Sequence, residues 1–140
     1  MTGALAERRA DAPAVSIMLP AEAESLMIVR QAVTGVAEAM GIGDQRRDDM
    51  RIAVSEACTN VVVHAYPDIP GSLRVGLWAD DGGLVIRVTD AGRGIVPDPL
   101  RQSPGLGIGL QLMATLADDM HLSTPAGGGT EVVLTFLAGS

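Results

Sequence analysis

Apolar and polar residues alternate with the period of an α-helix in three parts of the chain. Apolar positions three and four residues apart predict amphipathic helices over residues 21–40, 44–66 and 105–117. Gly41 and Gly43 are expected to end the first helix, and Asp44 to cap the second. The second helix is predicted to be buried over much of its circumference by a continuous apolar stripe, Met50, Ala53, Val54, Ala57 and Val61. The third helix is predicted to face inward at Leu110, Met113, Ala114 and Leu116 or Ala117.

Short apolar runs outside these helices predict strands. They cover residues 15–19, 73–79, 84–89, 121–124 and 130–137. Glycine-containing turns at residues 80–83 and 125–129 predict two antiparallel hairpins. Residues 91–104 are rich in Gly, Pro and Arg with little periodicity, which is typical of a loop or lid. This order of elements predicts an α/β sandwich, with a mixed, mostly antiparallel sheet and helices on one face.

The composition indicates one domain with an aliphatic core. The chain has 140 residues but only one Trp, one Tyr and one Phe. Residues 1–13 are polar and irregular, and we expect them to form a disordered tail ahead of a single domain at 14–138. The one cysteine, Cys58, lies in the apolar helix and is expected to be a small buried hydrophobe.

The charge pattern narrows the possible functions. A net charge of -7 argues against a nucleic-acid partner, because a phosphate backbone needs a basic surface. All ten basic residues are arginines, so the lysine of phosphate-binding loops, protein kinases and Schiff-base enzymes is missing. We find no apolar run of signal-peptide or membrane-spanning length, and expect a cytoplasmic protein without a membrane partner.

A carboxylate interrupts the most apolar helix. Glu56 costs several kcal/mol in such surroundings unless it is paired, on the order of a lost hydrogen bond or more. Asn60 lies one turn further on, so both side chains project from the same face. The two are either surface polar groups or a mutually satisfied pair, or they form a site. In a site, Glu56 would act as a base and Asn60 would offer its carbonyl oxygen to a hard cation such as Mg²⁺.

Asp90 follows a predicted strand and precedes Gly92 and Gly94. Such a sequence is common in ordinary strand-ending turns. It also suits a carboxylate that accepts a hydrogen bond from an exocyclic amine, with the glycines allowing a flat ring to approach the backbone.

Glycines also open the third predicted helix. The N–H groups at the start of a helix have no intrahelical acceptors, so Gly105, Gly107 and Gly109 predict an anion cradle that needs no lysine. Residues 127–129 are expected to form a hairpin turn, and Thr130 after them would add a hydroxyl to the same pocket.

In order and spacing, these four groups resemble the N, G1, G2 and G3 boxes of the GHKL ATPases, the superfamily of gyrase and histidine-kinase ATP domains with the Bergerat ATP-binding fold. Residues 53–57 with Thr59, followed by His64, Ala65 and Tyr66, resemble the anti-sigma-factor serine kinases of the RsbW and SpoIIAB type. The resemblance covers residues 15–137, nearly the whole chain.

The resemblance implies ATP and Mg²⁺ as cofactors. Glu56 would be the general base, and Asn60 would ligate Mg²⁺. Asp90 would bind the adenine amino group, with Gly92 and Gly94 beside the ring and Thr130 behind it. The helix-opening glycines would hold the phosphates, and Arg93 or Arg101 would supply positive charge from the lid.

The resemblance also implies an anti-sigma factor that binds a sigma factor and phosphorylates a serine of an anti-anti-sigma (STAS-type) protein, as a homodimer. Two alternatives remain at this stage. The short segment between Gly94 and Gly105 suits a regulatory module that holds ATP without transferring phosphate. The ATP domain of a histidine kinase is disfavoured by the absence of a preceding dimerisation helix pair with an acceptor histidine.

Overall fold

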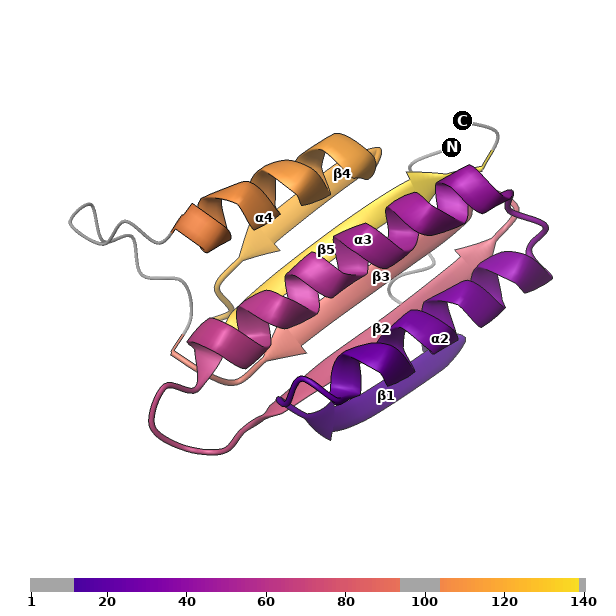
Figure 1. The fold of residues 1–140 in the computed structure, drawn as a ribbon. Helices are drawn as coiled ribbons and strands as arrows, with labels where there is room; N and C mark the ends of the chain where they lie inside the picture. Colours follow the sequence, from indigo (N-terminus) through magenta and orange to yellow (C-terminus); the bar gives the residue numbers. More distant parts are fainter. Residues whose placement is uncertain (1–11, 94–103, 139–140) are drawn as a thin grey trace.

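The computed structural model describes residues 12–93 and 104–138, with the backbone alone at 104–107 (Figure 1). Residues 1–11 of the predicted tail and 94–103 of the predicted lid therefore lie outside the described residues. The elements, in chain order, are β1 (Val15–Pro20), α2 (Ser25–Ala39), α3 (Asp44–Asn60), η1 (Val61–Ala65), β2 (Ser72–Asp80), β3 (Gly83–Asp90), α4 (Pro104–Leu116), β4 (Asp119–Ser123) and β5 (Thr130–Leu137). The predicted strands and helices all form, with shifted ends.

The strands form one sheet in the order β1-β2-β3-β5-β4, and the three α-helices lie on one of its faces (Figure 1). Every pairing between the described strands is antiparallel. The prediction of a mostly antiparallel sheet with helices on one face is confirmed, but the predicted mixed character is wrong. The reason is the crossover through α4. It carries the chain past one strand position to the edge, and β5 then returns through a hairpin into the gap, antiparallel to both neighbours.

The core lies between this sheet and the helices and is aliphatic, as predicted. The predicted apolar stripe of α3 is buried along its whole length. The predicted inward-facing positions of the third helix are confirmed for Met113 and for Ala117, directly after α4, which are both buried. Leu110 and Leu116 are partly buried and pack on the core. Ala114 is exposed, because the buried positions of α4 are spaced four residues apart and leave it on the outer side. Cys58 is fully buried, and burial raises the pKa of its thiol to about 12.

The helix starts differ from the predictions. The first helix begins at Ser25 rather than at residue 21, because residues 21–24 form a turn in which Glu22 N–H donates to the Pro20 carbonyl (2.8 Å). Asp44 does not cap α3. The N-cap is Gly43, without a side-chain hydrogen bond, and Asp44 is the first helical residue, paired with Arg47. A carboxylate at that position still favours the helix through the helix dipole.

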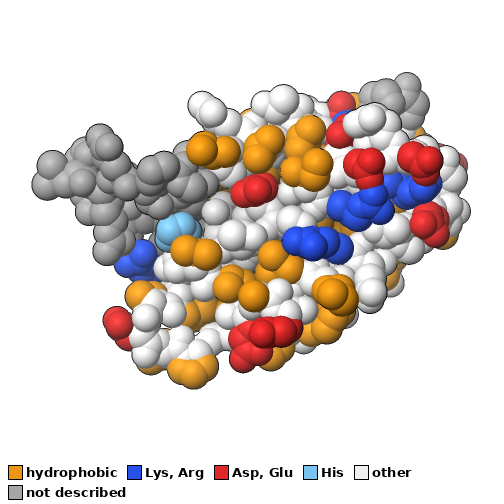
Figure 2. Space-filling view, viewed as in Figure 1, with side chains coloured by type: hydrophobic (Ala, Val, Ile, Leu, Met, Phe, Trp, Pro, Cys, Tyr) orange, Lys and Arg blue, Asp and Glu red, His pale blue; other side chains and the backbone are white. Residues whose placement is uncertain are grey.

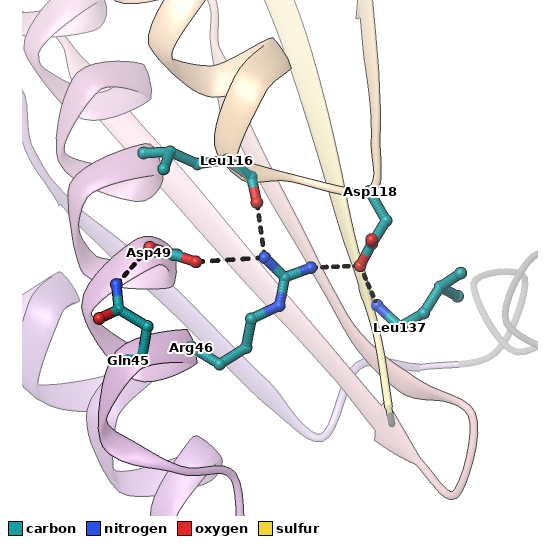
Figure 3. A network of polar contacts seen from close by, with 6 residues as sticks. All are labelled: Gln45, Arg46, Asp49, Leu116, Asp118 and Leu137. Carbon is teal, nitrogen blue, oxygen red and sulfur yellow. Dashed lines mark hydrogen bonds and ion pairs between the residues drawn. The ribbon is translucent and has the colours of Figure 1, made fainter. Parts of the chain in front are cut away.

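Charged side chains gather at the end of the helix face where α3 begins (Figure 2). One of the more enclosed of them is Arg46. Its guanidinium donates to the Leu116 carbonyl at the end of α4 (2.7 Å) and pairs with Asp118, which accepts from Leu137 N–H (2.7 Å) (Figure 3). It also lies over the Phe136 ring, 4.9 Å from the centroid. Arg46 therefore joins the start of α3 to the end of α4 and to β5.

No helix among the described residues is long and apolar enough to span a bilayer.

Candidate functional site

Helices α3 and α4 meet at the two polar residues that the sequence singled out. An ideal Cβ built on Gly109 of α4 would lie 2.8 Å from Glu56 Oε2 and 3.7 Å from Asn60 Oδ1. Both side chains of α3 therefore face the same point on α4. The position of the Glu56 carboxylate therefore depends on this glycine, since a methyl group on residue 109 would displace the carboxylate.

The carboxamide of Asn60 is not satisfied by the protein. Its Nδ2 is buried and has no hydrogen-bond partner among the described residues. Glu56 and Asn60 are thus not the mutually satisfied pair that the sequence left open. A buried donor without a partner costs about 1–3 kcal/mol, and such groups in native proteins call for an explanation. A bound ligand that supplies an acceptor is one.

Asp90 was predicted to follow the strand directly and is its last residue, and its carboxylate is held by backbone groups. Its Oδ1 accepts a hydrogen bond from Gly92 N–H (2.9 Å), and the backbone N–H of Thr130 donates to it as well. Partial burial raises the pKa of Asp90 above its ordinary value, and these two hydrogen bonds oppose the rise. An acceptor that is desolvated yet aimed by the backbone is suited to a ligand N–H group.

The glycines around Asp90 allow close backbone contacts. An ideal Cβ on Gly92 would lie 2.1 Å from the Ala65 carbonyl oxygen, and one on Gly129 would lie 2.0 Å from the Asp90 carbonyl oxygen. Gly129 also has φ +84°, a conformation that favours glycine. Thr130 is paired with Asp90 in the sheet and is buried. Asp90, Gly92 and Thr130 are therefore brought together as predicted.

The glycines of α4 have two different positions. Gly105 is the second residue of the helix, where N–H groups have no intrahelical acceptor, and Gly107 is the fourth, where the intrahelical hydrogen bonds begin. Gly109 is the sixth residue, so its N–H is used inside the helix, and its importance is the contact with Glu56. Gly94 and Arg101 lie outside the described residues.

The sequence did not indicate the contacts that two residues make near the site. The first is Arg93, which was predicted to supply positive charge from the lid. Its Nε donates to the His64 carbonyl (3.0 Å) and its backbone N–H to the Ala65 carbonyl (3.0 Å). The second is Tyr66, whose hydroxyl accepts from Ala91 N–H (2.9 Å) and donates to the Ser72 carbonyl (2.6 Å). The sequence signals were that Tyr66 is the single tyrosine and that it belongs to the His64–Tyr66 part of the family resemblance, and neither assigned it a role.

The site residues thus form two groups. Glu56, Asn60 and Gly109 make up one, and Asp90 with Gly92 and Thr130 the other. They are joined through η1, because Ala65 at its end contacts Gly92. One group offers an oriented carboxylate for an amine, and the other offers a carboxylate and a carboxamide beside free helix-start N–H groups. Such an arrangement suits a ligand with a base at one end and phosphates at the other.

Comparison with known proteins agrees with this geometry. The model of the histidine kinase-like ATPase domain family matches residues 19–136. The chain is 36% identical to the serine-protein kinase RsbW of Bacillus cereus, over 77% of this chain and 76% of the relative, and 34% identical to the enzyme of the same name from Bacillus mycoides over the same shares.

A solved structure adds the fold. The crystal structure of the RsbU and RsbW domains of a Mycobacterium tuberculosis protein superposes with a TM-score of 0.65 at 25% identity, covering 88% of this chain. This chain spans only 31% of that longer one. The family model and the curated relatives each cover most of the chain. It therefore belongs to the histidine kinase-like ATPase domain family and, within it, to the RsbW serine-protein kinases.

Proposed function

We propose that the chain binds Mg-ATP between α3, α4 and the end of β3, and transfers the γ-phosphoryl group to a serine of a partner protein. The family is one of ATP-dependent protein-serine kinases, so the enzyme class follows from membership. The role of each residue is part of the proposal. The observation that carries the proposal is the buried carboxamide nitrogen Nδ2 of Asn60, which has no partner among the described residues and lies on the face of α3 that carries Glu56.

The β3 end is proposed as the adenine site. The Asp90 carboxylate would accept from the adenine amino group, because it is aimed by the N–H groups of Gly92 and Thr130. Gly92 and Gly94 would lie beside the ring and Thr130 behind it. A site that recognises an amine with a buried acceptor rejects bases that lack the amine, since the acceptor is then left unpaired.

The α3–α4 contact is proposed as the phosphate site. The free N–H group at Gly105 would donate to a phosphate oxygen, with Gly107 leaving the first turn of α4 without a side chain, which removes the need for a lysine. Gly109 would keep α4 close to α3. A carboxamide carries both a donor and an acceptor, so Asn60 fits either a phosphate oxygen or a cation. Mg²⁺ held by Asn60 and the phosphates would neutralise their charge during transfer.

Glu56 is proposed as the general base. It would take the proton of the partner's serine hydroxyl as the serine oxygen bonds to the γ-phosphorus and the bond to the β–γ bridging oxygen breaks. The half-buried carboxylate lies one turn from Asn60, so one helix would position both the base and the phosphate ligand.

The partners are proposed from the family resemblance. The chain would bind a sigma factor in one complex and phosphorylate a STAS-type anti-anti-sigma protein in another, acting as a homodimer without direct nucleic-acid contact. The net charge of -7 supports the last point.

Labelled transfer with separate binding measurements tests this function. With γ-labelled ATP, Mg²⁺ and a STAS-type substrate, we expect label on a substrate serine. Glu56→Gln is expected to lower the phosphotransfer rate by about 10²–10⁴-fold. The affinity for ATP, measured by titration calorimetry, should remain nearly unchanged. Glu38→Gln, on the exposed surface of α2, is the matched control and should match the wild type. ATP binding without any labelled serine would favour the alternative of a regulatory module that holds ATP without transferring phosphate. The absence of ATP binding would contradict the proposal.

A further inference from the structure

We infer that Tyr66, together with the last two carbonyls of η1, is a positioning clamp that sets residues 91–93 and thereby aims Asp90 at the adenine ring. The inference rests on the proposed function of Asp90. It assigns Tyr66 and Arg93 as positioning residues and not as ligands of the nucleotide.

Three hydrogen bonds make up the clamp. The Tyr66 hydroxyl accepts from Ala91 N–H (2.9 Å). The Ala65 carbonyl accepts from Arg93 N–H (3.0 Å), and the His64 carbonyl accepts from Arg93 Nε (3.0 Å). They hold Ala91 and Arg93, on either side of Gly92, against the end of the helical segment that carries Glu56.

The end of the helix supplies the acceptors. The last carbonyls of a helix have no intrahelical donors. Here the chain leaves the helix at Tyr66, with φ -129° and ψ 75°, and Pro67 has no N–H with which to continue it. The carbonyls of His64 and Ala65 are therefore directed to Arg93. This accounts for Arg93 without a role in phosphate binding.

The Tyr66 ring is fixed by Gly71. An ideal Cβ on Gly71 would lie 2.2 Å from Tyr66 Cε1, so the ring occupies the space that a side chain would fill. The hydroxyl also donates to the Ser72 carbonyl (2.6 Å) at the start of β2. Because ring and hydroxyl are both held, the Ala91 N–H meets an acceptor in a set position.

The clamp acts on Asp90 through its neighbour. Asp90 Oδ1 accepts from Gly92 N–H, and Gly92 is held between Ala91 and Arg93 while it lies against Ala65. Moving residues 91–93 would therefore turn the carboxylate that is proposed to meet the adenine amine. The effect should appear in nucleotide affinity and not in the transfer step, which uses the Glu56 group.

Tyr66→Phe tests the clamp, since it keeps the ring on Gly71 and removes only the hydroxyl. We expect the Kd for ADP and the KM for ATP to rise about five- to tenfold, with kcat unchanged, as for the loss of one hydrogen bond. In nucleotide-free protein, amide hydrogen exchange should speed up at Ala91 and stay slow at Arg93, whose acceptor remains.

Gly71→Ala provides a second variant, because its methyl would displace the ring, and it should raise the same Kd at least as much. Gly43→Ala is the control, with nothing within 4 Å of its Cβ, and should bind ADP like the wild type. An unchanged Kd in Tyr66→Phe overturns the inference, as does a fall in kcat in step with the folded fraction. Failure of the wild type to bind ADP would instead contradict the proposed function. The rate of amide hydrogen exchange at Ala91 would still test the clamp, because it is measured in protein without nucleotide.

Discussion

Gly109 of α4 faces Glu56 of α3 so closely that a methyl group on Gly109 would lie 2.8 Å from the carboxylate oxygen Oε2. Glycine in a helix interior costs about 1 kcal/mol relative to alanine, so its presence here is set by this contact. The glycine keeps the proposed base and the proposed phosphate helix in register.

Gly109→Ala should separate catalysis from folding. The Glu56 carboxylate is the end of a flexible side chain and can swing away, so we expect stability within about 1 kcal/mol of the wild type. The displaced base should lower the phosphotransfer rate by about 10²-fold, as a misplacement of about 1 Å does. Transfer assays and thermal melts measure the two effects.

Gly35→Ala is the matched control for this change. Gly35 lies within α2 and has nothing within 4 Å of its Cβ. Alanine there should stabilise the protein by about 0.5–1 kcal/mol without altering transfer. A folded Gly109→Ala variant with wild-type transfer would rule out Glu56 as the base in this geometry.

Asp90→Asn should abolish most nucleotide binding without destabilising the protein. Loss of a charged acceptor is expected to weaken ADP binding by about 10–100-fold, as for 1.5–3 kcal/mol. Removing a partly desolvated charge should leave thermal stability at neutral pH equal or higher. Asp81→Asn, in the exposed β2–β3 turn, is the control and should change neither quantity. Wild-type affinity in Asp90→Asn would contradict the adenine role.

Nucleotide binding by the wild type should also depend on pH. The pKa of Asp90 is raised above 3.8, so the acceptor becomes protonated at a pH where an ordinary aspartate is still charged, and ADP affinity should fall there. Stability should respond in the opposite sense. The fold favours the neutral acid, so the contribution of Asp90 is fully present below pH 3.8 and lost as pH rises through the raised pKa. Calorimetry and melts across this range, with Asp90→Asn as reference, check both signs.

Arg46→Ala should be strongly destabilising. The change removes the donor to the Leu116 carbonyl and the ion pair with Asp118 (Figure 3). It also removes the contact with Phe136. We expect a loss of about 2–4 kcal/mol in the free energy of unfolding. Arg51→Ala is the comparison, because its pair with Asp48 is more exposed and should contribute at most about 1 kcal/mol. Equal effects in denaturant titrations would show that Arg46 is only a surface charge.

The sequence by itself determined which segments become helices and strands and which of their faces are buried. The stripe from Met50 to Val61 was readable because burial on one face leaves a local period of three and four residues. Glu56 and Asn60 were placed on one face for the same reason. Asp90 was found because it directly follows an apolar run, and Cys58 because it lies within one.

Only the tertiary structure decided how these parts meet. No local pattern indicates that Gly109 faces Glu56, that Tyr66 donates to Ser72 and accepts from Ala91, or that Arg93 serves the end of η1. The failed cap at Asp44 and the exposure of Ala114 depend likewise on how the helices lie against the sheet. Periodicity records whether a residue is buried, whereas the distance between two backbones depends on atoms far apart in the chain. Contacts of that kind are settled when the layers pack.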